Sequence, residues 1–285
     1  MREMEYPMER RINWIRVFLI LGLAVAVVSV RFLLSMVSMT SESSDVMMTI
    51  LVKRGFLESF FALLLWAVIA RNTTRKDIKT LIIDLKPYIT IAALFLVAGI
   101  ITGALLQDTL RGLLQSLFED MARQAEEIES IPVYQQIFFI FGNNAGVAVL
   151  CSFVPGIFSA LPPWIGALIS PLIMLFNGFV IGVAPAMIGM SWSHFVIAIL
   201  PHGVFELPAL VLASAVGVKF GLSVLKATIG FVFPPYGVSR DEAFLREVKP
   251  GWKCLKLFAV IIPLLVVAGI IEIVVSVRVT EFLGM

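Results

Sequence analysis

The sequence is poor in charge, histidine and cysteine, and each shortage excludes a class of protein. Only 15% of its 285 residues are charged, whereas a soluble domain usually carries about 25%. The net charge of +2 is too small and too spread out to favour binding to nucleic acid. The two cysteines, Cys151 and Cys254, cannot form a disulfide framework, and neither lies in a CxxC or Cys/His cluster. We expect no soluble domain, no nucleic-acid partner and ordinary small-residue roles for both thiols.

The abundant residues are apolar, and they occur in long runs. Hydrophobic residues make up 59% of the chain, and the runs are about 20 residues long, the length that spans a bilayer as a helix. They do not alternate with period two, which argues against barrel strands. The first run is longer than the core of a signal peptide, so we interpret it as an uncleaved anchor. The prediction is an all-α, polytopic transmembrane helical bundle, a multi-pass protein of the cell membrane.

About seven spans are expected. The second is short for a bilayer, and the sixth is interrupted by prolines, so a re-entrant sixth segment would reduce the count to six. The seven are Trp14 to Ser38, Gly55 to Ala70, Tyr88 to Leu106, Val133 to Pro155, Trp164 to Gly189, Trp192 to Gly217 and Leu257 to Val277.

The charges between the runs predict an orientation. Residues 71–86 carry five basic and two acidic groups, and residues 219–256 carry seven basic and three acidic groups. Basic loops stay in the cytoplasm, so both segments and the N-terminus are expected there. Residues 107–132 are acidic, have apolar side chains at helical spacing and are expected outside as an amphipathic helix. We divide the chain into an N-terminal hairpin with its basic loop, 1–86, and a five-span domain, 87–285.

Several polar side chains are expected at one depth in the membrane. A rise of about 1.5 Å per residue puts Asn143 about 15 Å deep, Asn177 about 18 Å, and His202 and Glu206 about 15 and 21 Å. All lie near the middle of a hydrocarbon core about 30 Å thick. Asn143, its neighbour Asn144, Asn177, His202 and Glu206 therefore form our candidate site for a ligand or ion, because such groups must face partners or water in lipid.

The stretch "AILPHGVFELPALVLA" contains the ionisable pair of this site. His202 and Glu206 are four residues apart and so lie on one helical face. Pro201 and Pro208 flank them, which predicts a kinked or restarted helix, with Pro201 able to begin the new one. We assign Pro201, Gly203 and Pro208 structural roles at this break.

Two interpretations of the polar residues stay open. They form either a satisfied internal network that fixes helix packing or a functional site for an ion, a proton or a ligand. A metal site is not expected, because HExxH is absent and one His with one Glu falls short of three ligands. No cofactor is expected.

Other residues predict helix contacts. Four glycine pairs have GxxxG spacing, which favours close helix packing; among them we assign Gly178 and Gly182 a structural role. Arg31 and Glu58 lie at similar depth in the first two spans and are a candidate ion pair, although each could also extend separately to the interface. Glu272, near the outer end of the last span, could do the same or join an outer polar cluster.

Three stretches in series carry a family resemblance: "FGNNAGVAVLCSFVPGIF", "LFNGFVIG" and "ILPHGVFELPALVLASAVG". Together they resemble the stage II sporulation protein M family of integral membrane proteins, over approximately residues 86–285. The resemblance implies one span, an outer loop and four further spans. The family namesake is implied to work in a membrane complex with peptidoglycan hydrolases during septal thinning and engulfment.

We rank three functional hypotheses. The first is a non-enzymatic scaffold or anchor in a membrane-associated complex. The second is a small transporter or channel, because broken helices and polar groups at one depth are typical of transporter sites. An intramembrane enzyme comes last, because no nucleophile is well placed. The expected partners are the lipid bilayer and membrane or extracytoplasmic proteins, and a homo-oligomer stays open.

Overall fold

The computed structural model describes residues 14–39, 44–159 and 163–276, and these residues are helical with short connections. The elements are α1 (Trp14–Met39), α2 (Ser44–Ala70), α3 (Arg75–Asp84), α4 (Lys86–Glu129), α5 (Val133–Phe158), α6 (Pro163–Met187), α7 (Trp192–Val232), α8 (Arg240–Cys254), η1 (Leu255–Leu257), α9 (Phe258–Ile271) and η2 (Glu272–Ser276). The expected position of the N-terminus concerns residues outside this description.

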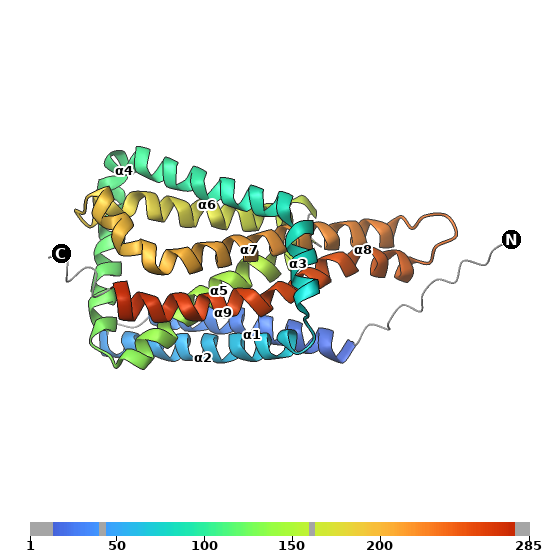
Figure 1. Cartoon of the computed structure of the whole chain (residues 1–285), viewed down its shortest axis with the longest axis horizontal. Coiled ribbons are helices and arrows are strands. Elements are labelled where there is room, and N and C mark those ends of the chain that lie inside the picture. Colours follow the sequence, from blue (N-terminus) through green and yellow to red (C-terminus); the bar gives the residue numbers. More distant parts are fainter. Residues whose placement is uncertain (1–13, 40–43, 160–162, 277–285) are drawn as a thin grey trace.

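Six of these helical segments are long and apolar enough to cross a membrane, so the chain is a multi-pass membrane protein. They correspond to every expected span except the second, Gly55 to Ala70. That segment belongs to α2, which runs beside α1 (Figure 1) but is not among the six candidates. The helix carries Lys53, Arg54 and Glu58 in its middle. The expected count of seven is therefore one more than the candidates in the described residues.

Helix α7 corrects the expectation of a broken sixth span. It is one helix of 41 residues, with Pro201 and Pro208 inside it. Pro201 is therefore not the first residue of a new helix, and a re-entrant segment is wrong. Figure 1 shows that α7 bends in its N-terminal part. A proline removes one backbone hydrogen bond and bends a helix without always ending it.

Helix α4 also extends further than expected. It joins the third expected span and the amphipathic segment 107–132 into one helix of 44 residues that ends at Glu129. Figure 1 shows that α4 turns, so that its C-terminal part crosses one end of the bundle. We call this end the α4 end and the opposite one the α8 end.

The two basic segments lie together at the α8 end, where α3 and α8 are found (Figure 1). Lys256 Nζ lies 2.9 Å from Asp77 Oδ2 and links the segments. Asp77 and Thr74 also form a capping box at the start of α3. The hydrogen bond from the Thr74 backbone N–H, followed by the one from Lys256, lowers the pKa of Asp77 to about 2. Because both segments share one end, they satisfy the charge rule with a single orientation.

A glycine contact joins α4 to α6. A Cβ atom at any of four glycines would collide with a backbone carbonyl oxygen of the facing helix, so the two backbones touch directly. Small residues permit this approach, and close van der Waals packing drives helix association in lipid. The four are Gly99, Gly103, Gly178 and Gly182. The structural role expected for Gly178 and Gly182 is thus a contact with the matching pair on α4.

Helix α5 lies in the interior of the bundle and positions the asparagines. Its residues Ala145, Ala148, Val149 and Cys151 are buried, and it packs against α2, α7 and α9. Against α2, the Ser59 hydroxyl donates to the Phe138 carbonyl oxygen at 2.7 Å. The close approach fixes α5, and with it Asn143 and Asn144, relative to its neighbours.

Candidate functional site

A cavity of about 730 Å³ lies within the bundle at the α4 end. Its volume is in the range typical of pockets for small ligands, about 300 to 1,000 Å³. The walls come from α2, α4, α5, α6, α7 and η2. The polar side chains among them are Arg54, Glu129, Gln136, Asn143, Asn144, His202, Glu206 and Glu272.

Four of the five predicted site residues therefore line one cavity. His202 and Glu206 come from one face of α7, and Asn143 and Asn144 are adjacent on α5. Asn144 is only 9% exposed. Asn177 is not among the described residues that line the cavity. Its side-chain amide donates to the Ile173 carbonyl oxygen of its own helix at 2.8 Å, which satisfies it locally.

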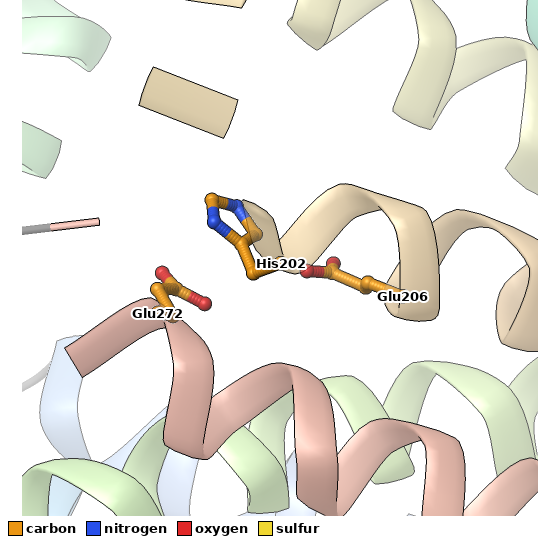
Figure 2. Close-up of side chains that lie close together, drawn as sticks. All are labelled: His202, Glu206 and Glu272. Carbon is orange, nitrogen blue, oxygen red and sulfur yellow. The ribbon is translucent and has the colours of Figure 1, made fainter. Parts of the chain in front are cut away.

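Glu272 completes a cluster that the sequence left open. One ligand atom from each of His202, Glu206 and Glu272 lies within 4.8 Å of the other two. Figure 2 shows the three side chains in the space between α7 and the end of α9. Glu272 begins η2, a five-residue π-helical turn that continues α9. Single π-helical turns widen a helix locally and are frequent at functional sites.

Arg31 belongs to a second polar group, which lies next to the cavity. Its guanidinium donates to the Asn143 backbone oxygen at 3.0 Å and to the Asn143 side-chain oxygen at 2.7 Å. Its Nη1 atom also lies 3.5 Å from Glu58 Oε1, so the candidate ion pair is present in the structure. Glu58 is fully buried. Asn143 thus faces the cavity and also accepts from Arg31, a role that its position in the sequence did not indicate.

Glycine makes room for this ion pair. A Cβ atom on Gly146 would collide with Arg31 Nη1 and lie 3.2 Å from Glu58 Oε1. The Gly142 and Gly146 pair therefore has two different tasks. Gly142 allows α5 to approach the Gly55 backbone of α2, whereas Gly146 leaves space for a charged side chain.

The wall next to the α4 end is held by Gln136, which sequence reasoning missed. Its side-chain amide donates to the Glu129 and Ile131 carbonyl oxygens at 3.2 and 2.8 Å, and so closes the turn between α4 and α5. A buried glutamine four residues after a proline could have been recognised as a capping residue, because orphan carbonyls at a helix end need donors.

The charges in the cavity favour a positively charged ligand. Two carboxyl groups and one imidazole lie close together in this cavity, whose lining also includes Arg54, and like charges repel more strongly within a protein than in bulk water. A cation or a proton reduces this repulsion. The cavity lining, among the residues that the structure describes, includes no Ser, Thr or Cys. The arrangement suits binding of a cation or polar solute.

Comparison with known proteins gives one family match and one curated relative. The family model for stage II sporulation protein M matches residues 92–277. An uncharacterized protein of Methanocaldococcus jannaschii, MJ0706, is 29% identical over 136 residues, which are 48% of this chain and 53% of that protein. The chain thus spans about half the length of this relative. None of the solved structures matches the chain. The matched region contains every residue that lines the cavity except Arg54 of α2, and the chain belongs to the stage II sporulation protein M family.

Proposed function

We propose that the protein is a small membrane transporter or channel that binds a cationic or polar solute in the cavity at the α4 end. The observation that carries this proposal is the convergence of His202, Glu206 and Glu272 on one cavity of about 730 Å³. Ionisable groups are costly inside a membrane helix, and they are typical of ion and substrate pathways.

The elements around the cavity also resemble those of a transport site. One wall is a bent helix with two prolines, and another ends in a π-helical turn. Departures from regular helix at membrane depth occur where backbone groups face protein or a water-filled cavity. Asn143 and Asn144 add amide oxygens and N–H donors to the same space.

A flux assay tests the proposal. Purified protein in liposomes should carry a saturable flux in a panel of protons, monovalent and divalent cations and small organic cations. Glu206→Gln should lower the rate by about 10- to 100-fold, because one hydrogen bond to a charged group contributes about 1.5 to 3 kcal/mol. Glu126→Gln is the matched control, since Glu126 is an exposed carboxylate of α4 that does not line the cavity. The absence of flux for every solute in the panel would contradict transport.

A scaffold or anchor is the second candidate, and a different feature favours it. The C-terminal part of α7 and α8 form a hairpin that extends beyond the other helices (Figure 1). Phe231 and Phe244 contact edge to face across its two arms, and Gly237 makes the turn with a φ of +78°. Phe233 and Tyr236 are exposed at its tip. Exposed apolar groups at the end of a rigid arm are typical of a docking surface for another protein.

Co-purification tests the scaffold. A partner should be recovered from native membranes with the wild-type protein and lost with Phe233→Ser and Tyr236→Ser combined. The control is Ile83→Ser, because Ile83 is an exposed apolar residue of α3 at the same end of the bundle. Recovery of the same proteins with the hairpin variant would remove the hairpin as the docking surface.

The proposed orientation puts the α8 end in the cytoplasm, with the cavity end outside. It is supported by the basic residues of α3 and α8 at one end. Labelling of intact cells with a membrane-impermeant maleimide tests it. Glu126→Cys on α4 should react and Tyr236→Cys at the hairpin tip should not. The two native thiols are buried, so they should add little background, and the reverse pattern would invert the orientation.

A further inference from the structure

We propose that His202, Glu206 and Glu272 together form a binding site for one divalent transition-metal ion. Three potential ligand atoms whose pairwise distances are all within 4.8 Å leave a point no more than about 2.8 Å from each of them. Zn²⁺ binds nitrogen and oxygen ligands at about 2.0 to 2.2 Å. Each side chain therefore has to move by less than about 1 Å, which small changes in side-chain torsion can provide.

The types of ligand select the class of ion. Ca²⁺ and Mg²⁺ prefer sites made of oxygen alone. An imidazole nitrogen with two carboxylate oxygens suits the first-row divalent ions, such as Zn²⁺, Mn²⁺ and Fe²⁺. Among the common ones Zn²⁺ is expected to bind more tightly than Mn²⁺. The remaining coordination positions face the cavity, so water or a bound solute can occupy them.

The charge balance supports the same conclusion. Two carboxylates and a divalent cation sum to zero, so the bound ion removes the repulsion between Glu206 and Glu272. It also lowers the cost of keeping two carboxylates within a membrane bundle, where an unpaired charge is unfavourable. The cavity also supports a metal site, because it gives an ion both space and access to the cluster.

The three ligands come from two elements that are far apart in the sequence. His202 and Glu206 belong to α7, and Glu272 belongs to η2. Along the chain, Glu206 and Glu272 are separated by the rest of α7, by α8 and by α9. A bound ion would link the end of α9 to the part of α7 that carries His202 and Glu206. This inference rests on the cavity of the proposed transporter, but the ion can be either its solute or a fixed part of the site.

Equilibrium binding in detergent tests the site. Tag-free protein is stripped with a chelator, dialysed against Zn²⁺ or Mn²⁺ and analysed for bound metal and affinity. One ion per chain is expected. Glu272→Gln and His202→Ala should each weaken Zn²⁺ binding by at least about 100-fold, because even loss of a residue behind a ligand costs about 10- to 100-fold. Co²⁺ should give a visible absorption band in the wild type that changes in His202→Ala.

The chain offers two matched controls. His194 is the other histidine, and it is exposed and hydrogen-bonded to Ser191; His194→Ala should leave Zn²⁺ affinity unchanged. Glu126→Gln should do the same, because Glu126 is an exposed carboxylate of α4 that does not line the cavity. Elution as a single monodisperse species shows that each variant is folded. If one ligand variant does not fold, the other, together with Glu206→Gln, provides the same comparison.

Three results would overturn the metal site: stripped wild-type protein that takes up no ion at micromolar concentrations, Glu272→Gln with wild-type affinity, or Ca²⁺ binding as tightly as Zn²⁺. The last would exclude the imidazole as a ligand. Liposome flux of another solute without metal binding would retain the proposed transporter and remove this inference. Metal binding without any flux would retain the site and remove the transporter.

Discussion

Two groups of ionisable side chains lie at the same end of this bundle, and they differ in charge and in what surrounds them. Arg31, Glu58 and Asn143 join α1, α2 and α5, and the two charges have opposite sign. His202, Glu206 and Glu272 join α7 to η2, and two of them are carboxylates. Glu58 is completely buried, whereas all three residues of the second group line a cavity.

The difference separates packing from binding. In the first group each charge has a protein partner, and a glycine leaves room for the guanidinium. Such a group holds helices in register, and of its three members Asn143 alone lines the cavity. In the second group the carboxylates repel each other and face open space. Titratable side chains that gather in a cavity are characteristic of a binding site.

The largest effect should come from removing the cation of the first group. Arg31→Met leaves Glu58 buried without a partner, and we expect a loss of about 3 to 5 kcal/mol in the free energy of unfolding. Thermal or denaturant unfolding in a fixed detergent measures it. The double variant Arg31→Met with Glu58→Met should recover most of the loss. If the double variant is as unstable as the single one, the ion pair is not the cause.

A pair of glycine substitutions sharpens the comparison. Gly146→Ala pushes against Arg31 and should cost about 1 to 3 kcal/mol, as overpacking does. Gly203→Ala, between the ligands of the second group, meets only Ile199 Cγ2 at 3.1 Å. The gain in helix propensity of about 1 kcal/mol offsets that contact, so stability should change by less than about 1 kcal/mol. Equal destabilisation by both changes would remove the distinction between a packed site and an open one.

Neutralising a carboxylate should have opposite signs in the two groups. Glu58→Gln removes the partner of Arg31 and should destabilise the protein by about 1 to 3 kcal/mol. Glu272→Gln in metal-free protein relieves repulsion, and its stability should stay unchanged or rise by up to about 1 kcal/mol. Parallel melting curves in chelator give the answer. Destabilisation by Glu272→Gln would mean that Glu272 is paired within the protein.

The smallest effect is expected far from both groups, at Asp77. Its pKa of about 2 lies below the ordinary value of about 3.9, so its charge contributes stability above about pH 4. The contribution is lost as the pH falls through 2. Asp77→Asn should cost less than about 1 kcal/mol at neutral pH, because the pair is partly exposed. The difference between variant and wild type should disappear near pH 2, and a difference that persists there would have another origin.

The sequence was sufficient for the features that depend on one helix. Apolar length identifies the six candidate spans, and a spacing of four residues places His202 and Glu206 on one face. The GxxxG spacing predicts close contacts, because a helix with a glycine stripe can approach a neighbour wherever it packs. The two prolines were a weaker guide, since the bent helix α7 continues through both.

Features that depend on two helices could not be predicted. Glu272 joins His202 only because α9 returns beside α7 and ends in a π-helical turn there. Asn177 was assigned by depth, but a helical asparagine can satisfy its amide on its own backbone. Counting residues along a span gives the depth of a side chain in the membrane, but it does not give the side of the helix on which that side chain lies. The side of the helix decides which residues line the same cavity.

The unbroken course of α7 has a mechanical consequence. One helix, roughly 60 Å long, carries the cavity ligands near its start and one arm of the hairpin at its end. No flexible linker separates the two, and prolines such as the two inside α7 are common causes of helix bending. A ligand that drew Glu206 toward Glu272 would therefore act on a helix whose C-terminal end lies at the opposite side of the bundle. If such a ligand binds, α7 connects its site to the hairpin at the α8 end without a break.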